Sequence, residues 1–369
     1  MKIAIVLPDL RGGGAERILI DLAREWLVRG FDVDFVLLRP EGELLQLVPH
    51  GASVIDLGVE RFRDAVLPLR AYARQQEPSV LLAAMWPLTV VTVMATRSSG
   101  KSVRAVLSDH SILSRDYQHK GMLHRALLRL SMAFGYRWAD ALVAVSVGVA
   151  ADASALSGIR PDRFRVIFNP AAKCVSSVGR LAIPTELAEV RGQLILSVGT
   201  LKAVKDHPLL IDAFSRLAPY LDVTLCILGE GPLRVELERL VIRRGLQGRV
   251  LLPGFRVETG PWYARADLFV LSSRHEGFGN VLVEALEHGV PVVSTDCPTG
   301  PREILCDGKY GRLVPVGDAD ALAEAMRAGL SETPRREALK ARSRDFCADR
   351  IADEYLEVMF PGWRGAGRQ

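Results

Sequence analysis

The feature that most constrains this fold is the regular alternation of short apolar segments with amphipathic ones. Residues 2–7 and 31–38 are short apolar runs of the kind that form buried strands. Between them, residues 15–29 repeat apolar side chains with helical spacing, as at Ile18 and Leu22. The same pattern predicts further strands at 52–57, 80–85, 103–108 and 141–146. Strands that alternate with helices form a mostly parallel sheet covered on both faces, so the fold class is α/β.

The alternation is interrupted once, which predicts two domains. The pattern loosens after residue 170 and restarts at Gln193, and a chain of 369 residues is long enough for two hydrophobic cores. In the second half we expect helices at 206–218 and 232–244 and strands at 223–228, 249–252 and 266–273. The predicted parts are therefore a domain over 1–170, a linker over 171–192, a domain over 193–345 and a closing helix with a tail over 346–369.

The composition favours a globular protein of a reducing compartment. Hydrophobic residues make up 49% of the chain and charged residues 24%, and no apolar run reaches the roughly 18 residues of a transmembrane helix. The first residues are better explained as a strand than as a signal peptide. The cysteines are odd in number and lack metal-binding spacing, which argues against disulfides and zinc and favours the cytoplasm. They are Cys174, Cys226, Cys297, Cys306 and Cys347.

Positive charge is concentrated in one part of the first domain. Residues 61–137 contain twelve Lys or Arg and four Asp or Glu, a net charge of +8, which suggests an anionic partner. Within that range, 61–76 and 119–138 combine basic and apolar residues and could lie as helices on an anionic membrane. The alternative is a pair of core-facing helices with solvated basic edges. Nucleic acid is disfavoured, because no recognition motif accompanies the charge.

A glycine-rich loop with an acidic residue lies between the strand at 266–273 and a helix expected at 281–287. Asn280 is the expected N-cap of that helix, and Gly289 its expected C-cap. Ligands of doubly wound sheets bind at the carboxyl ends of strands, where free helix amides attract phosphate. Glu276 lies in the loop and Glu284 in the helix. Glu276 is free to face a substrate, and Glu284 could accept two vicinal hydroxyls of a ribose, since a carboxylate receives two donors at once. Solvated glutamates at such places are also common.

These residues and their neighbours resemble a known enzyme family. The segment from Glu276 to Glu284, with Gly277, Phe278, Gly279, Asn280 and Val281 between them, is similar to the Glu-x7-Glu signature of retaining glycosyltransferases of family four. The flanking segments 267–272, 289–293 and 300–303 resemble the same family. The resemblance implies the GT-B fold, with two doubly wound Rossmann-like domains, an interdomain cleft and a last helix that returns to the N-terminal domain. It also implies that Glu276 contacts the donor sugar and Glu284 the ribose, with phosphate cradled by the amides between them.

The loop after the first predicted strand is a second candidate. Residues 11–16 carry three consecutive glycines directly before a helix, so backbone amides can approach an anion closely. A flexible turn would also explain the glycines. The family has a similar loop near the donor diphosphate and the acceptor, which points to Gly13 and Gly14.

His110 follows the strand expected at 103–108. A lone histidine is more often structural than catalytic. The resemblance matches His110 with a family histidine that touches the donor sugar. In the favoured front-face mechanism no side chain is glycosylated, so His110 would stabilise charge in the transition state and not act as a general base.

The loop after strand 193–198 resembles the family's phosphate loop. Lys205 matches the family lysine, but Thr200 stands where an arginine is usual, so a bidentate cation is missing. Lys202 could take over part of that role, although an exposed lysine in a turn is the simpler explanation. Glu230, in a Gly-Glu-Gly-Pro turn, and Phe255, after the next strand, are candidates for contact with the nucleotide.

The expected reaction uses no metal and no cofactor. Asp318 and Asp320 have the spacing of a metal-binding pair but precede a helix, where capping explains them. The expected donor is a UDP-sugar, perhaps an N-acetylhexosamine because of the Gly-Gly-Gly-Ala-Glu loop. The expected acceptor is a glycan or a polyprenyl-diphosphate-linked glycan, reached from the cytoplasm or peripherally at the inner face of the membrane. Alternatives are a nucleotide-sugar epimerase or hydrolase and a non-catalytic sugar-nucleotide-binding protein.

Overall fold

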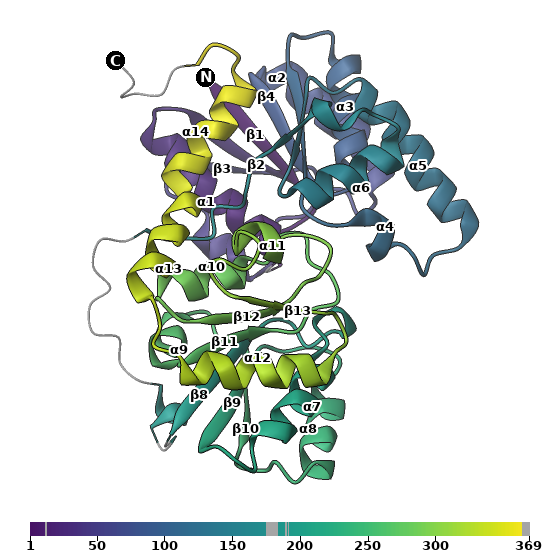
Figure 1. The fold of residues 1–369 in the computed structure, drawn as a ribbon. Helices are drawn as coiled ribbons and strands as arrows, with labels where there is room; N and C mark the ends of the chain where they lie inside the picture. The colour runs from purple at the N-terminus through teal and green to yellow at the C-terminus, as the bar shows by residue number, and fades with distance from the viewer. Residues whose placement is uncertain (12, 175–183, 189, 191, 364–369) are drawn as a thin grey trace. The chain divides into compact units, whose positions relative to one another are not determined.

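The computed structural model of the chain describes residues 1–11, 13–174, 184–188, 190 and 192–363. Its contacts divide the chain into two compact units. The N-terminal unit comprises residues 1–170 and 348–369, and the C-terminal unit comprises residues 171–347. Both are layered α/β structures (Figure 1).

A seven-stranded parallel sheet forms the centre of the N-terminal unit. Its order is β3-β2-β1-β4-β5-β6-β7, so the direction of winding reverses between β1 and β4. The central strands are almost fully buried, as expected for a sheet covered on both faces. The strands are β1 (Lys2–Leu7), β2 (Asp32–Leu37), β3 (Ser53–Asp56), β4 (Val80–Ala84), β5 (Arg104–Asp109), β6 (Ala141–Ala144) and β7 (Phe164–Val166).

Two layers of helices cover this sheet. Helices α1 and α14 pack together on one face, where they share a hydrophobic core with β1, β2 and β4. Helices α2, α3, α5 and α6 form the other layer (Figure 1). The helices are α1 (Gly14–Val28), α2 (Val66–Gln76), α3 (Leu88–Ser99), α4 (Leu113–Asp116), α5 (Met122–Arg137), α6 (Val147–Ser157) and α14 (Ala348–Met359), with short 3-10 turns η1 (Glu43–Leu47), η2 (Phe62–Ala65) and η3 (Pro161–Arg163).

The last helix is firmly attached to the N-terminal unit. The indole Nε1 of Trp26 donates a hydrogen bond to the carbonyl of Ala352 at 3.2 Å, and Arg29 pairs with Asp353 at 2.7 Å. The ring of Tyr355 packs edge-on against Trp26 inside the core. Helix α14 therefore completes the core of a unit whose other residues end at 170.

The C-terminal unit has a six-stranded parallel sheet in the order β10-β9-β8-β11-β12-β13. Its strands are β8 (Gln193–Val198), β9 (Val223–Leu228), β10 (Val250–Gly254), β11 (Leu268–Leu271), β12 (Val292–Thr295) and β13 (Arg312–Val314). Its helices are α7 (His207–Leu217), α8 (Arg234–Arg243), α9 (Gly260–Arg265), α10 (Asn280–Glu287), α11 (Pro301–Ile304), α12 (Ala319–Ser331) and α13 (Arg336–Ser343), with 3-10 turns η4 (Thr185–Leu187), η5 (Ala203–Lys205) and η6 (Arg344–Phe346).

The predicted fold class is confirmed: both sheets are parallel, doubly wound and covered by helices. The side chain of Asp318 accepts a hydrogen bond from the Ala321 amide at 2.9 Å, so its predicted capping role is confirmed as well. The predicted N-cap at Asn280 is wrong. Gly279, with φ 101°, caps α10, and Asn280 is the first helical residue. The predicted linker, 171–192, includes residues 175–183, 189 and 191, which lie outside the described residues.

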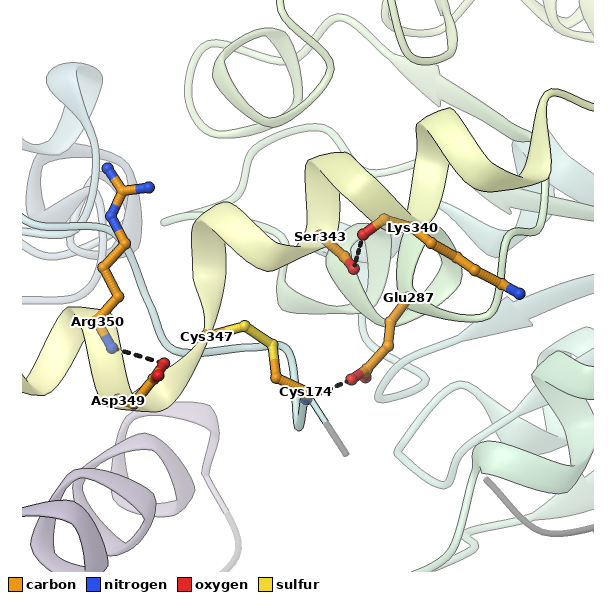
Figure 2. Close-up of a disulfide and its surroundings, with 7 residues drawn as sticks. All are labelled: Cys174, Glu287, Lys340, Ser343, Cys347, Asp349 and Arg350. Atoms are coloured by element: carbon orange, nitrogen blue, oxygen red, sulfur yellow. Dashed lines mark hydrogen bonds between the residues drawn. A yellow bond between two sulfur atoms is a disulfide. The ribbon is translucent and has the colours of Figure 1, made fainter. Parts of the chain in front are cut away.

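The expectation that no disulfide forms is also wrong. Cys174 and Cys347 are bonded, with Cα atoms 5.8 Å apart (Figure 2). An isolated parallel bridge between Ala172 and Cys347 places the two cysteines side by side. These segments are 173 residues apart in sequence, so neither spacing nor the odd cysteine count could reveal the pair. The predicted reducing compartment rested on the absence of disulfides, so the cysteines no longer support it.

The disulfide predicts a specific loss of stability. Because the bond closes a 173-residue loop of the unfolded chain, Cys174→Ser should lower the free energy of unfolding by about 2–4 kcal/mol in non-reducing buffer. Thermal unfolding measures the change, with Cys306→Ser, at a half-buried free cysteine, as the matched control. Dithiothreitol should bring the wild type to the level of Cys174→Ser. Equal stability of the wild type and Cys174→Ser without reductant would contradict the prediction.

Candidate active site

The candidate site of the C-terminal unit lies where its sheet reverses direction. Strands β8 and β11 are neighbours in the sheet, although β9 and β10 separate them in sequence. The loop after β8 ends at Lys205, and the loop after β11 contains Glu276. Doubly wound sheets bind their ligands at the carboxyl ends of the two strands that flank such a switch point.

An ion pair joins the two loops. The Lys205 Nζ lies 2.6 Å from the Glu276 Oε1, and the two side chains are only 19% and 11% exposed. The Ser273 hydroxyl donates to the same oxygen at 2.6 Å, and Thr299 donates to the Glu276 carbonyl. These bonds fix one carboxylate oxygen. Among the described residues, none donates a hydrogen bond to the other oxygen, Oε2, which can therefore accept donors from a ligand.

The turn between Glu276 and α10 depends on two glycines. Gly279 has φ 101°, and Gly300, with φ 83°, passes so close that a Cβ there would lie 1.7 Å from the Phe278 carbonyl oxygen. The Phe278 ring is buried against Phe346, so only the backbone of Phe278 can serve a ligand. The first amides of α10 come next in the chain, at a helix end that attracts negative charge.

Glu284 lies one turn further along α10 and is half-buried. Its Oε2 is 3.4 Å from the hydroxyl of Thr259, which precedes α9. The buried Tyr263 lies beneath and donates to the Val281 carbonyl at 3.3 Å. Burial and, after it, the nearby charge of Glu284 raise the pKa of the Tyr263 phenol. The phenol is therefore uncharged, and it lies close to the Glu284 carboxylate.

The β8 loop contains two other candidates, Thr200 and Lys202, and neither is part of the ion pair. Thr200 and Lys202 are exposed, and within the described part of the chain no hydrogen bond joins either side chain to Glu276 or Glu284. The loop itself is closely packed: a Cβ at Gly229 would lie 2.0 Å from the Gly199 carbonyl oxygen. The backbone at the ends of β8 and β9 is therefore fixed, whereas the two side chains can rearrange.

Glu230 and Phe255 lie at the ends of the next strands. The Glu230 carboxylate pairs with Arg234 at 2.8 Å, one turn along the chain, and is half-exposed. Gly254, with φ 90°, leaves room for that carboxylate, since a Cβ there would be 2.8 Å from Glu230 Oε1. The Phe255 side chain is 62% exposed, which is unusual for an aromatic ring and compatible with stacking on a ligand.

Four residues of this site were missed by the sequence analysis. Ser273 and Thr299 hold Glu276, and Arg274 pairs with the buried Asp206 at 2.7 Å. The Arg274 amide also donates to the Val204 carbonyl at 2.8 Å, which ties the two loops together a second time. Of these residues, only Ser273 could have been recognised from the sequence, because it lies directly before the loop that contains Glu276. The contact of Thr299 comes from a segment 23 residues away.

The candidate loop of the N-terminal unit contains an acidic group. Gly13 caps α1 and Gly14 is its first residue. The carboxylate of Glu16 folds back over the cap, so a Cβ at Gly13 would lie 2.0 Å from Glu16 Oε2. Burial raises the pKa of Glu16. An acceptor oxygen at this place favours a hydroxyl donor over a phosphate, although Gly13 and Gly14 themselves leave the backbone accessible.

His110 follows β5 and is held by a chain of hydroxyl groups. Its Nε2 lies 3.0 Å from the Ser108 hydroxyl, which is 2.9 Å from the Tyr355 hydroxyl on α14. The Nδ1 of His110 is buried and has no hydrogen-bond partner among the described residues. Burial lowers the pKa of His110 to about 4, so the ring is neutral at pH 7.

Asp109 was not predicted and lies on the opposite face of β5. Its Oδ1 accepts a hydrogen bond from the Tyr136 hydroxyl on α5 at 2.6 Å. Burial raises the pKa of Asp109 to about 7. Successive strand residues point to opposite faces, so Ser108 and Asp109 are each anchored by a tyrosine from a different layer of helices.

Within the described ranges, no three His, Cys, Asp or Glu side chains are grouped so that they could hold a metal ion. A metal-independent reaction stays a prediction. None of the described helices is both long and apolar enough to cross a bilayer.

Comparison with known proteins follows the same division of the chain. Residues 12–171 match the family model described as Glycosyltransferase Family 4, and residues 192–332 match the one described as Glycosyl transferases group 1. The N-acetylgalactosamine-N,N'-diacetylbacillosaminyl-diphospho-undecaprenol 4-alpha-N-acetylgalactosaminyltransferase of Campylobacter jejuni is 31% identical over 371 residues, covering 97% of this chain and 99% of the relative.

A second relative and a solved structure are also similar to this chain over most of its length. The lipopolysaccharide core biosynthesis glycosyltransferase LpsE of Rhizobium meliloti is 29% identical over 362 residues, which cover 95% of this chain and 96% of the relative. The crystal structure of Anabaena Alr3699/HepE in complex with UDP and glucose is similar in fold, with a TM-score of 0.80 at 24% identity over 97% of this chain and 99% of that one. The chain belongs to the group 1 glycosyltransferases of family 4 and has the GT-B fold, which confirms the resemblance.

The buried His110 predicts a loss of stability in acid. Burial lowers the pKa of His110 to about 4, while in the unfolded chain a histidine titrates near about 6.5. The stability from the neutral ring is complete above about 6.5 and is lost as the pH falls through about 4. His110→Gln should therefore flatten the fall in unfolding free energy between these pH values, measured by urea unfolding. His119→Gln, at an exposed histidine, is the control and should keep the wild-type slope. An unchanged slope in His110→Gln would contradict the prediction.

Proposed function

We propose that this glycosyltransferase moves a sugar from a nucleoside diphosphate to a glycan or lipid-linked acceptor with retention of configuration. The observation that carries the proposal is the buried Lys205–Glu276 pair at the switch point, with one carboxylate oxygen held and the other accessible to hydroxyl donors. Glu276 binds the donor sugar and Glu284 the ribose. Lys205 and the first amides of α10 bind the diphosphate.

In the proposed reaction the acceptor oxygen attacks the anomeric carbon on the face that the diphosphate leaves. The new C–O bond forms as the bond to the phosphate oxygen breaks, and the acceptor proton passes to that oxygen. His110 acts on the same donor as a neutral hydrogen-bonding group that stabilises developing charge. Lys205 and helix amides offset the charge of the leaving diphosphate, so the mechanism needs no metal ion.

A UDP-sugar is the favoured donor. The fold relative Alr3699/HepE was solved with UDP and glucose, and the Campylobacter relative is named for N-acetylgalactosamine transfer. An N-acetylhexosamine is therefore our proposal for the sugar. In the nucleotide site, the exposed Phe255 offers a face for the base, and Glu230 lies in the neighbouring turn. Thr200 in place of the family's arginine leaves Lys202 as the added cation of the loop.

Substitution of Glu276 separates catalysis from nucleotide binding. Glu276→Gln keeps the shape of the side chain but weakens its contacts with the sugar hydroxyls, so transfer from a UDP-sugar should fall by at least about 100-fold. Stabilisation by UDP alone should persist, since the glutamine oxygen can still accept from Lys205 and Ser273 and so keep the proposed phosphate contacts in place. Product formation with and without a lipid-diphosphate glycan acceptor measures the first effect, and thermal shift measures the second.

The control is Glu236→Gln, which changes an exposed glutamate on α8 and should transfer like the wild type. Wild-type transfer by Glu276→Gln would reject the assigned role. Sugar isomerisation or hydrolysis without acceptor would favour the epimerase or hydrolase alternative. Stabilisation by UDP-sugars without any turnover would favour a binding protein. GDP- and ADP-sugars are screened alongside, and a preference for either would overturn the UDP assignment.

We also propose that α5 rests on an anionic membrane. One face of α5 is buried through Leu128, Met132 and Tyr136, and packs on α3 and α6. The opposite face carries an apolar stripe that is exposed along the whole helix, where water is a poor environment for it. We call it the outer stripe: Leu123, Leu127, Leu130, Phe134 and Trp138.

Charge supports the same proposal. Arg125, Arg129 and Arg137 are exposed on α5, as expected for a helix that meets anionic headgroups. In Figure 1 this helix lies at the outer edge of the N-terminal unit. The stretch 61–76 differs. Leu69 and Tyr72 of α2 are buried, so most of its apolar face belongs to the core and the core-facing alternative describes it better. The Campylobacter relative is named for an undecaprenol-linked acceptor, which supports a peripheral location, and we propose the cytoplasmic face.

Charges on the outer stripe should release the protein from vesicles. Leu127→Glu with Leu130→Glu removes two exposed apolar side chains and adds repulsion, so binding to phosphatidylglycerol vesicles should fall at least about tenfold. Vesicle flotation measures binding, which for the wild type should also decrease with added salt. Val235→Glu, at an exposed apolar residue of α8, is the control. Equal loss in both proteins, or none in either, would contradict the proposal.

A further inference from the structure

The hydroxyl chain beside His110 determines which ring nitrogen carries the proton. Ser108 lies between His110 Nε2, at 3.0 Å, and the Tyr355 hydroxyl, at 2.9 Å. Ser108 and Tyr355 are almost completely buried. A buried hydroxyl hydrogen needs an acceptor, and a buried ring nitrogen needs a partner, so the two possible directions of this chain can be compared by what each leaves unsatisfied.

In one direction, Tyr355 donates to Ser108, and Ser108 donates to the lone pair of His110 Nε2. Both hydroxyl hydrogens are then used. The proton of the neutral ring must be on Nδ1, which is left as a single donor without an acceptor among the described residues.

In the other direction, His110 Nε2–H donates to Ser108, and Ser108 either donates to Tyr355 or accepts from it as well. Either the phenol hydrogen or the Ser108 hydrogen then has no acceptor, because no further hydrogen bond of these two hydroxyls is found within the described chain. The Nδ1 lone pair is unpaired as well. This direction leaves two buried groups unsatisfied instead of one and is disfavoured.

We propose that Tyr355 and Ser108 are positioning residues that hold His110 as the Nδ1–H tautomer, so that the imidazole donates a hydrogen bond to a ligand oxygen. The ring then has no free lone pair, since Nε2 accepts from Ser108 and Nδ1 carries a proton. His110 is a fixed donor and not a general base. That the ligand is the donor sugar or its diphosphate rests on the proposed function.

The proposal gives the C-terminal helix a role in the site. Tyr355 belongs to α14, which is 247 residues from Ser108 in sequence. Its ring is anchored against Trp26 and its hydroxyl reaches the end of β5. The helix therefore sets the orientation of a side chain at the carboxyl edge of the sheet, in addition to completing the core.

The first test needs no substrate. Long-range 1H–15N NMR spectra of the imidazoles distinguish the two tautomers, and His110→Gln identifies the His110 signals. We expect Nδ1–H in the wild type and a shift towards Nε2–H in Ser108→Ala and in Tyr355→Phe. An Nε2–H ring in the wild type, or an unchanged Nδ1–H ring in both variants, would overturn the proposal.

The second test uses transfer kinetics. Loss of the fixed orientation should lower kcat about 10- to 100-fold in Ser108→Ala, with a smaller loss in Tyr355→Phe and little change in the donor KM. Tyr72→Phe is the matched control, because it removes another buried hydroxyl of the same unit, bonded to Asp34 at 2.6 Å and absent from this chain of groups. If Ser108→Ala does not fold, Tyr355→Phe decides.

The two hypotheses fail separately. A wild-type protein that transfers no sugar from any donor would reject the proposed function, while the NMR result would still decide the tautomer. Transfer that proceeds with equal kcat in the wild type, Ser108→Ala and Tyr355→Phe would overturn the positioning role and leave the proposed function intact. A kcat loss in Tyr72→Phe equal to that in Tyr355→Phe would also overturn it, since both would then report a general loss of packing.

Discussion

The ion pair between Lys205 and Glu276 connects the two loops on which the candidate site of the C-terminal unit depends. A buried charge pair is unfavourable unless its remaining hydrogen-bonding capacity is satisfied. Here Ser273 donates to the carboxylate and Thr299 to the carbonyl of the same residue. The left-handed conformation of Gly279 then lets the chain enter α10 directly after the pair. One electrostatic contact thus fixes the carboxylate, the turn and the helix end together.

In the N-terminal unit, β5 is a buried strand that carries polar side chains, which also need hydrogen-bond partners. Ser108 faces α14 and Asp109 faces α5, and each is bonded to a tyrosine hydroxyl, Tyr355 and Tyr136 respectively. Buried polar groups persist in a sheet interior when such partners are present. The strand end is thereby held from both faces. The position of His110, the next residue, is therefore fixed by helices that are far away in sequence.

The sequence was sufficient for the parts of the fold that depend on local pattern. Strand β9 lies at the predicted residues, 223–228, because an apolar run bounded by turn residues is a short-range signal. The Lys205–Glu276 neighbourhood was accessible through the family motif. The Cys174–Cys347 bond, the contact of Thr299 and the Tyr355 hydroxyl were not, because each depends on segments brought together only by the folded chain. The cap at Gly279 was missed because a side-chain cap at Asn280 was assumed where backbone conformation decides.

The paired charges also bear on the missing arginine at Thr200. Lys205 is bonded to Glu276 and Arg274 to Asp206, so two of the cations at this edge are each neutralised by a carboxylate. A bidentate arginine at position 200 would add uncompensated positive charge, and a threonine does not. In the proposed reaction, a diphosphate at this edge is therefore bound by Lys205 and by the amides that begin α10, with the exposed Lys202 as an added cation. Binding by amides is directional, since each donates along its N–H bond, so the proposed anion site lies at the helix end that follows Glu276 in the chain.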